Sequence, residues 1–293
     1  MYYRKTVGGR IFDAVNGCIM ILLALVCLAP LIHVLFASIS DPTLVSSYQG
    51  LIWHPLGKVN VEGYKRVFQD SSIWMGYFNT IIYVVAGCVL NVITTCIGAY
   101  VLSRKNFATR NFWMAFISIT MVFNGGLVPT YMIVKDLGMI DTRAAMIIPG
   151  ALSAFNLIIM RTSFMSLPAG LEEAARIDGA NDFTILFRII IPLSKAVIAV
   201  IVLFTAVGVW NSWFNAMIYL RDSSKWPLQM VLKEILIQND ISSAKTGASA
   251  MVDLYNQLIK YASIIVATLP ILCVYPFVQK YFVKGVLIGS LKG

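Results

Sequence analysis

The sequence predicts an all-α membrane protein with six transmembrane helices and one helical elbow held outside the membrane. Three observations lead to this fold class. Of the 293 residues, 58% are hydrophobic and only 13% are charged, a composition typical of a chain with several membrane spans. Six long apolar runs contain no charged residue. A charged stretch, residues 166–192, separates the fourth run from the fifth.

A helix that crosses a bilayer needs about 20 apolar residues. Each of the six runs meets or approaches this length, and we expect them to span the membrane as parts of a single domain, 1–293. The runs are 14–40, 76–102, 111–134, 144–160, 196–220 and 261–279. The fourth run is the shortest, and Arg143 and Arg161 at its two ends can extend their charged groups to the membrane surface.

The basic residues predict the orientation of the chain. An even number of spans places both termini on the same side of the membrane. With the N-terminus inside, the cytoplasmic segments hold 13 of the 23 basic residues, although these segments are the shorter ones. Because lysine and arginine concentrate in cytoplasmic loops, we expect both termini and the stretch 166–192 to be cytoplasmic.

The stretch 166–192 has the start and stop signals of two short helices. Ser166 can serve as the N-cap of the first helix, and Gly179 can end it in the left-handed conformation. Asn181 or Asp182 can cap the second helix, which we expect to run to Pro192. These signals predict two helices that meet at a glycine elbow.

The first of these helices combines small and charged residues. Ala174 and Ala175 leave its surface without bulk, so that another protein backbone can approach closely, and Glu173, Arg176 and Asp178 offer charged contacts around them. On these features alone, a solvated loop helix explains the pattern as well as a docking helix does.

The spacing of this stretch resembles the EAA loop of ABC importer permeases. Glu173-Ala174-Ala175, Gly179, Ile189 and Ile191-Pro192 match the family pattern E-A-A, G, I-x-L-P, except that isoleucine replaces leucine at position 191. The resemblance implies the type I ABC importer fold, in which this loop is a coupling helix that docks in a groove of a cytoplasmic ATPase. The residues to which it assigns ATPase coupling are Glu172, Glu173, Ala174, Ala175, Asp178, Gly179 and Pro192.

Two further segments resemble the carbohydrate branch of this family. The tail 279–293 is similar to the C-terminal signature of sugar-importer permeases, which implies that Lys284, Gly285 and Gly289 contact the ATPase. The resemblance is closest to the smaller permease of oligosaccharide and polysaccharide importers, the MalG-like group. Within that group, residues 123–142 and the tail look most like the LplC-like branch, which includes alginate and pectin-fragment systems, so the resemblance suggests the smaller permease of an alginate-type importer. The resemblance therefore implies a bacterial cytoplasmic (inner) membrane subunit that imports oligosaccharides or polysaccharides. An importer of another small solute is the alternative.

Polar residues within the third and fifth apolar runs are candidates for lining a transport cavity. Asn124 precedes two glycines and Pro129, which predict a kink, and asparagines alternate with aromatic residues in 210–215. Amides can bind sugar hydroxyls and aromatic rings can stack on sugar rings. Helix–helix hydrogen bonds and an interfacial aromatic belt explain the same residues equally well. The candidates are Asn124, Trp210, Asn211, Trp213 and Asn215.

The outer loops are candidates for contact with a soluble substrate carrier. The last of them contains a polar stretch, 239–249, which we expect to be flexible. In maltose-type importers the corresponding loop enters the cleft of the binding protein, so the resemblance allows the same role here. A plain connector is the alternative.

Other function classes lack their usual signals. No Walker A pattern occurs, so ATP and Mg²⁺ belong to a partner ATPase and this chain is neither an enzyme nor expected to bind a cofactor. Ion-coupled carriers usually have ionisable residues within their spans, and these six spans have none. The five cysteines form no C-x-x-C pair, so we expect no metal site, and the basic residues flank spans, so we expect no nucleic acid.

The number of partners follows from the single elbow. One six-span chain presents one coupling loop, whereas an ATPase dimer has two grooves. We therefore expect a second homologous permease, as a heterodimer, together with an ATPase dimer and an extracytoplasmic sugar-binding protein.

Overall fold

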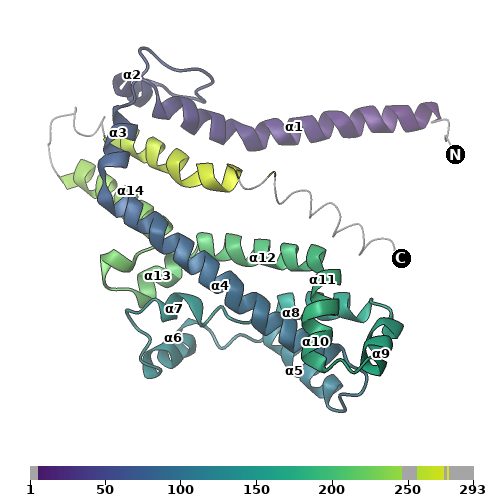
Figure 1. Ribbon diagram of the computed structural model, residues 1–293. Helices are drawn as coiled ribbons and strands as arrows, with labels where there is room; N and C mark the ends of the chain where they lie inside the picture. The colour runs from purple at the N-terminus through teal and green to yellow at the C-terminus, as the bar shows by residue number, and fades with distance from the viewer. Residues whose placement is uncertain (1–5, 246–255, 274–275, 277–293) are drawn as a thin grey trace. The chain divides into compact units, whose positions relative to one another are not determined.

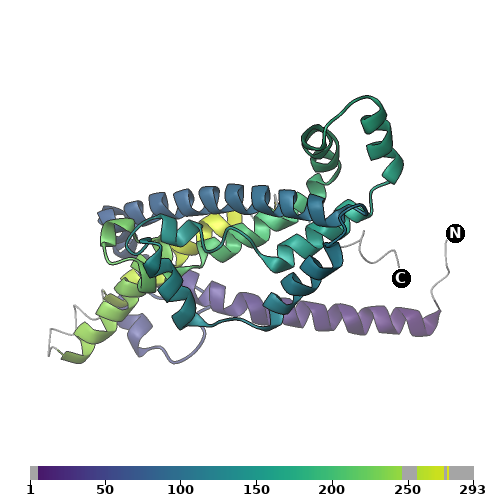
Figure 2. The same cartoon turned by 90° about the horizontal axis from the view of Figure 1, so that it is seen from below.

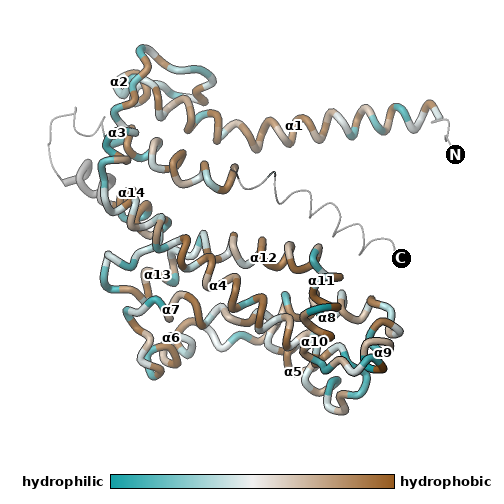
Figure 3. The backbone as a smooth tube through the Cα atoms, viewed as in Figure 1, coloured by the Kyte–Doolittle hydropathy of each residue, from teal (hydrophilic) through white to brown (hydrophobic). Residues whose placement is uncertain are grey.

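The computed structural model describes residues 6–245, 256–273 and 276, and every regular element in these ranges is a helix (Figure 1). The chain divides into two compact units, Met1–Ser71 with Glu234–Leu269 and Ser72–Lys233 with Pro270–Gly293. Hydrophobic residues, drawn brown in Figure 3, run along the long helices α1 (Val7–Ser38) and α4 (Ser71–Ser103). The helical class expected from the sequence is confirmed, and the division into a single domain stays a prediction.

The first unit holds the N-terminal span. Its helices are α1, α2 (Pro42–Ser47), α3 (Glu62–Gln69), the part of α14 (Leu228–Lys245) from Glu234 onward, and the helix Asn256–Cys273 up to Leu269. His33 of α1 accepts a hydrogen bond at Nδ1 from the backbone N–H of Ile52, 3.0 Å away, and its ring meets the ring of Tyr261 edge to face. This histidine is therefore a structural residue that holds the loop after α2 against α1.

The second unit holds the elbow and the helices around it. Its long helix is α4, whose first residue alone belongs to the other unit. The helices that follow are α5 (Arg110–Val122), α6 (Leu127–Asp136), α7 (Ala144–Ile147), α8 (Ala154–Met165), α9 (Ala169–Ile177), α10 (Asp182–Ile185), η1 (Leu186–Ile190), α11 (Ile191–Leu193), α12 (Lys195–Trp210), α13 (Trp213–Tyr219), η2 (Ser223–Lys225) and the start of α14 (Leu228–Lys245).

The spans are less regular than the sequence predicts. Within the described residues, three helices are long and apolar enough to cross a membrane, or five if each of two bent pairs counts as one span. The pair α5 and α6 bends by 114° at Gly125-Gly126, which confirms the predicted kink. The predicted span 144–160 consists of α7, a non-helical link and α8. The count of six continuous spans is therefore not established.

A polar cluster holds the loops beyond α6 and α13 together. The carboxylate of Asp141 accepts the backbone N–H groups of Arg221 and Asp222 at 3.1 and 3.0 Å, and its Oδ2 lies 3.3 Å from the ammonium of Lys225. Asp141 has a positive φ of 58°, a conformation that aspartate tolerates better than most residues. The hydroxyl of Tyr83 in α4 donates to the carbonyl of Lys225 at 2.7 Å, which attaches this cluster to α4.

The loop before the last predicted span, residues 221–260, is more helical than the sequence predicts. Helix α14 continues to Lys245, so residues 239–245 are helical rather than the flexible stretch that we expected. A helical backbone satisfies its own hydrogen bonds, so polar residues such as Asn239 can continue a helix. Residues 246–249 of the predicted stretch lie outside the described residues.

Candidate functional site

The elbow begins two residues later than the sequence suggests. Ser166 ends α8, where its hydroxyl donates to the carbonyl of Ser163 at 2.7 Å, so its predicted role as an N-cap is wrong. Pro168 occupies the residue before α9 with an extended ψ of 126°, and the helix starts at Ala169. A proline lacks the backbone N–H that would be left without an acceptor at this position, so it starts a helix without loss.

Gly179 ends α9 as the sequence predicts. Its φ is +82°, and the chain forms a Schellman motif in which the N–H of Ala180 donates to the carbonyl of Ala175 at 2.9 Å. The N–H of Gly179 donates to the carbonyl of Arg176 at 3.0 Å. Because a side chain is strained at this φ, glycine is the residue that permits the turn between the two arms.

The second arm starts at the predicted cap. The side-chain oxygen of Asn181 accepts the N–H of Thr184 at 2.8 Å, and helical backbone then continues through α10, η1 and α11 to Leu193, one residue beyond Pro192. This arm meets α12 at a bend of 83°. In Figures 1 and 2, α9 and α10 lie beyond the C-terminal end of α4, where a partner protein can reach them.

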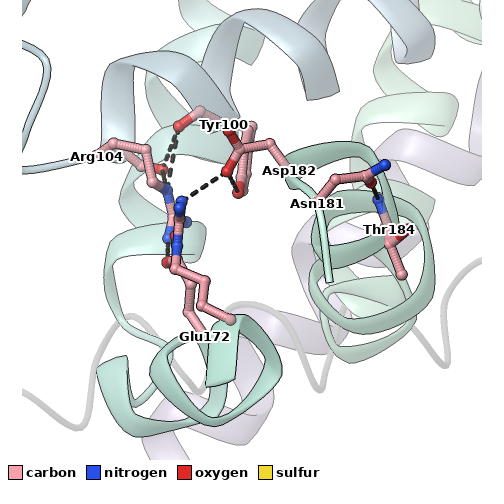
Figure 4. Close-up of polar contacts among 8 residues, drawn as sticks. Tyr100, Arg104, Glu172, Asn181, Asp182 and Thr184 are labelled. Atoms are coloured by element: carbon pink, nitrogen blue, oxygen red, sulfur yellow. Dashed lines mark hydrogen bonds and ion pairs between the residues drawn. The ribbon is translucent and has the colours of Figure 1, made fainter. Parts of the chain in front are cut away.

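Ion pairs attach the elbow to the end of α4 (Figure 4). Arg104, the residue after α4, forms an ion pair with Glu172 of α9. Arg176 lies 3.1 Å from Glu172 and 2.6 Å from the carboxylate of Asp182, so that it joins α9 to α10. The hydroxyl of Tyr100 in α4 donates to the same Asp182 carboxylate at 3.1 Å. The two arms are therefore tied to each other and to α4.

The electrostatics of Arg104 favour a fixed contact. Its guanidinium lies 4.4 Å from the centre of the Tyr100 ring, and its Nε donates to the Ser103 hydroxyl at 3.1 Å. Burial lowers the pKa of Arg104, but an arginine stays charged at any physiological pH. The side chains of Arg104 and Glu172 are only 21% and 16% exposed, so water screens this pair less than it screens a surface pair.

Burial divides the candidate coupling residues into two groups. Glu173, Ala174, Asp178, Gly179 and Pro192 are exposed and available to a partner. Glu172 points back toward Arg104.

Ala175 belongs to the inward group as well. It is 8% exposed and packs in a hydrophobic cluster that includes Tyr100, Phe164 and Ile185. The small size of Ala175 therefore serves packing within this chain, which corrects the expectation that both alanines form the outer surface.

Two apolar side chains add to the exposed face of the elbow. Ile177 at the end of α9 is 87% exposed and Phe183 in α10 is 69% exposed. Sequence reasoning did not single them out, although large apolar residues in an otherwise polar elbow are a usable signal. Exposed apolar side chains rimmed by charges are typical of protein contact sites.

A hollow of about 530 Å³ lies beside α9. The loop after α4 contributes Arg104 and Lys105 to its wall, and α5 contributes its first residue, Arg110. Helix α9 contributes Glu172, Glu173 and Arg176. The hollow thus presents an excess of positive charge next to the exposed face of the elbow.

The predicted cavity residues do not form one site. Asn124 accepts the N–H of Gly126 at 2.9 Å and is exposed, and the amide of Asn211 donates to the carbonyl of Val207 at 2.9 Å. The ring of Trp213 lies 3.6 Å from the ammonium of Lys233, and the indole N–H of Trp210 is buried without a partner among the described residues.

Among the five candidates, Asn215 alone lines the cavity of about 450 Å³ within the helices of the second unit. The other polar residues of that cavity include Asn91, Asn156 and Thr205, which sequence reasoning missed. The sequence could have identified them as candidates, because each is a polar residue within one of the six apolar runs. The predicted tail contacts Lys284, Gly285 and Gly289 lie outside the described residues.

Comparison with known families decides the identity of the chain. The model of the family described as binding-protein-dependent transport system inner membrane component matches residues 95–288, which include the whole elbow. The chain belongs to this family. Its members are transport components, so the chain is a translocation subunit rather than an enzyme, and the family assignment expected from the EAA pattern is confirmed.

Relatives of this family member extend over nearly its whole length. The polygalacturonan/rhamnogalacturonan transport system permease protein YtcP of Bacillus subtilis is 39% identical, over 97% of this chain and 99% of that protein. Protein LplC of the same organism is 38% identical, over 99% of this chain and 97% of that protein. The diacetylchitobiose uptake system permease protein NgcG of Streptomyces coelicolor is 27% identical, over 97% of this chain and 90% of that protein.

A solved structure confirms the fold of this permease. A chain of a bacterial ABC transporter involved in the import of the acidic polysaccharide alginate superimposes with a TM-score of 0.85 at 37% identity, over 96% of this chain and 99% of that chain. The protein therefore has the type I ABC importer fold. As a member of this family it is the membrane component of an ATP-driven importer, which works with a partner permease, an ATPase and a substrate-binding protein.

Proposed function

We propose that this permease imports oligosaccharides or polysaccharides and that the elbow, residues 166–192, couples its movement to ATP hydrolysis. The observation that carries the proposal is the elbow itself: its EAA and glycine positions match the family pattern, and its outer face is exposed while its inner face is anchored to α4. The relatives named above support a saccharide substrate, because their names refer to the transport or uptake of polygalacturonan/rhamnogalacturonan, diacetylchitobiose and alginate.

The contacts of the elbow support a mechanical role. A partner that grips the exposed face, with Glu173, Ala174, Ile177 and Phe183, would pull on two arms that hydrogen bonds and ion pairs tie together. That pull reaches α4 through Arg104 and reaches α12 through the bend of 83°. Rigid-body rotation of the helices between two states then opens the transport path to one side or the other.

The arrangement of the complete importer belongs to the same proposal. We infer a heterodimer with a second homologous permease, an ATPase dimer on the cytoplasmic side and a sugar-binding protein on the outer side. Both termini and the elbow are cytoplasmic in this arrangement, as the distribution of basic residues suggests. Proposed tail contacts with the ATPase through Lys284, Gly285 and Gly289 complete it.

Affinity purification from native membranes in mild detergent tests the proposal. We expect the tagged chain to co-purify with a P-loop ATPase and a second, different permease. The associated binding protein is then screened for binding to a saccharide panel that includes maltotriose, trigalacturonate and alginate trimers. Recovery of the chain alone, under conditions that preserve known importers, would contradict the coupling role. A binding protein that retains no saccharide but retains another solute would contradict the substrate class.

A further inference from the structure

The link between α7 and α8 is a break in an apolar segment (Figure 1). Residues 148–153 are non-helical and carry Pro149 and Gly150, so the backbone carbonyls here lose their helical partners. Side chains of α4 replace those partners: the amide of Asn91 donates to the carbonyls of Gly150 and Ala151 at 3.2 and 3.4 Å. Within a membrane, irregular backbone is tolerated where protein or a water-filled cavity surrounds it.

Three helices meet at a buried polar group behind this break. The side-chain oxygen of Asn91 accepts the amide of Asn156 in α8 and the hydroxyl of Thr205 in α12, each at 3.1 Å. Asn91 and Asn156 are 1% and 5% exposed. Burying an amide costs free energy unless its polar atoms are hydrogen-bonded. Polar groups buried within an apolar helix bundle are therefore candidates for a functional role.

One atom of this group lacks a hydrogen-bond partner among the described residues. The side-chain oxygen of Asn156 accepts no hydrogen bond from any residue in the described part of the chain, although its amide nitrogen is fully engaged. Asn156 lines the cavity of about 450 Å³, and so does Asn215 of α13, whose amide makes no hydrogen bond within the described residues. The cavity therefore offers both a hydrogen-bond acceptor and free amide donors.

The remaining wall of the cavity is aromatic and uncharged. The rings of Phe155 and Phe204 lie 6.2 Å apart and line it, together with the hydroxyl-bearing residues Ser153 and Ser212. No charged side chain is among its lining residues. Its volume falls in the range of small-molecule sites, about 300–1,000 Å³.

We propose that this cavity is a saccharide subsite that binds the hydroxyl groups of one sugar ring during transport. Asn156 accepts from one hydroxyl, Asn215 donates to another, and Phe155 and Phe204 contact the C–H face of the ring. The subsite binds hydroxyl groups rather than carboxylates, because no charged side chain lines it. This inference rests on the proposed saccharide transport and adds the residues that contact the sugar.

Cysteine labelling of the complete importer tests the subsite directly. The exposed cysteines Cys18, Cys27 and Cys273 are first replaced by alanine, whereas Cys88 and Cys96 are buried and stay. Asn215→Cys is then labelled with a maleimide, and Asn211→Cys serves as the matched control because it lies four residues earlier, at the end of α12, and does not line the cavity. We expect millimolar maltotriose and trigalacturonate to slow labelling at position 215 and not at 211. Equal rates with and without both sugars would overturn the subsite.

Transport by the same complex provides a second readout. Asn215→Ala should lower saccharide uptake about threefold to tenfold, the cost of one lost hydrogen bond, and Asn211→Ala should not. Both variants should co-purify with the ATPase and the second permease at the wild-type level, which shows that they are folded and assembled. Unchanged uptake in Asn215→Ala would overturn the subsite and leave the proposed function standing. If the wild-type complex takes up no saccharide of the panel, the proposed function fails and the subsite fails with it.

Discussion

Arg104, the first residue beyond α4, forms an ion pair with Glu172 of the elbow helix α9, and both side chains are mostly buried. The pair joins a long apolar helix to the helix that carries the EAA residues. Because Arg176 contacts the same glutamate and reaches Asp182 in the second arm, these ion pairs link both arms of the elbow to the end of α4. The charged residues of the elbow thus have two uses, with Glu172 turned inward and Glu173 turned outward.

We expect Arg104→Ala to uncouple ATP hydrolysis from transport. After the substitution, Arg176 is the one remaining ion-pair partner of Glu172 among the described residues. The free energy that holds α9 against the end of α4 should fall by about 1–3 kcal/mol. Uptake should fall by at least about tenfold, while the ATPase still co-purifies, since the exposed face is unchanged.

The charge swap Arg104→Glu with Glu172→Arg should restore part of the uptake if the pair itself matters. Lys105→Ala, a change in the neighbouring residue that forms no ion pair in the described structure, is the control. Uptake of Arg104→Ala equal to that of Lys105→Ala would show that the pair does not transmit movement.

The turn of the elbow predicts a graded response at Gly179. Its φ of +82° costs a residue with a side chain about 1–2 kcal/mol, and a Cβ at this position meets no atom within 4 Å. Gly179→Ala should therefore reduce uptake through the backbone alone, and Gly179→Asn should reduce it less because asparagine tolerates this conformation. Gly179→Pro should abolish uptake without affecting membrane insertion. Uptake rates that do not follow this order would contradict the role of the turn.

Ala174 and Ala175 should respond differently to a large side chain. Ala174 is exposed, so Ala174→Trp should block binding of the ATPase while the permease remains folded. Ala175 is 8% exposed within the cluster around Tyr100 and Phe164, so Ala175→Trp should overpack that cluster and cost about 1–3 kcal/mol of stability.

Co-purification of the ATPase and the melting temperature of the detergent-solubilised permease separate these two effects. Loss of ATPase binding with an unchanged melting temperature is expected for Ala174→Trp, and a lowered melting temperature for Ala175→Trp. A lowered melting temperature for Ala174→Trp together with loss of ATPase binding alone for Ala175→Trp would contradict the outward position of Ala174 and the inward position of Ala175.

The Asp141 cluster predicts a loss of stability in acid. Backbone hydrogen bonds from Asp222 and Arg221, with Lys225, hold the pKa of Asp141 below its ordinary value. Although partial burial disfavours its ammonium, Lys225 keeps a raised pKa because Asp141 and Asp222 face it. A carboxylate with a lowered folded-state pKa contributes stability above its unfolded pKa of about 3.9 and loses that contribution as the pH falls through the folded value.

Melting temperatures recorded from about pH 7 to about pH 3 check this prediction. The wild-type permease should lose stability toward the acid end of this range, and Asp141→Asn should show a smaller change with pH because it lacks the carboxylate. Asp136→Asn, which alters an exposed carboxylate at the end of α6, is the control and should follow the wild-type curve. Identical pH dependence in all three proteins would rule out a contribution from the Asp141 cluster.

Local signals were sufficient for much of the elbow. A positive φ at Gly179, the cap at Asn181 and the kink at Gly125-Gly126 each depend on a few neighbouring residues, and the structure has all three. The predicted start of α9 was wrong because a serine such as Ser166 can either cap the start of one helix or end the preceding one. Which of these roles a serine takes depends on where α8 stops, and that is decided by the packing of Phe164 and Met160 in the core rather than by the serine.

The sequence by itself determined the helical membrane class, the family and the position of the elbow, because apolar run length, charge placement and the EAA spacing are properties of consecutive residues. Only the tertiary structure decided which side of α9 faces outward, so that Glu172 and Ala175 turned inward while Glu173 and Ala174 stayed exposed. It also brought Asn91, Asn156 and Thr205 together from three helices. Contacts between residues tens of positions apart depend on how helices pack, and no local pattern in a single sequence specifies that packing.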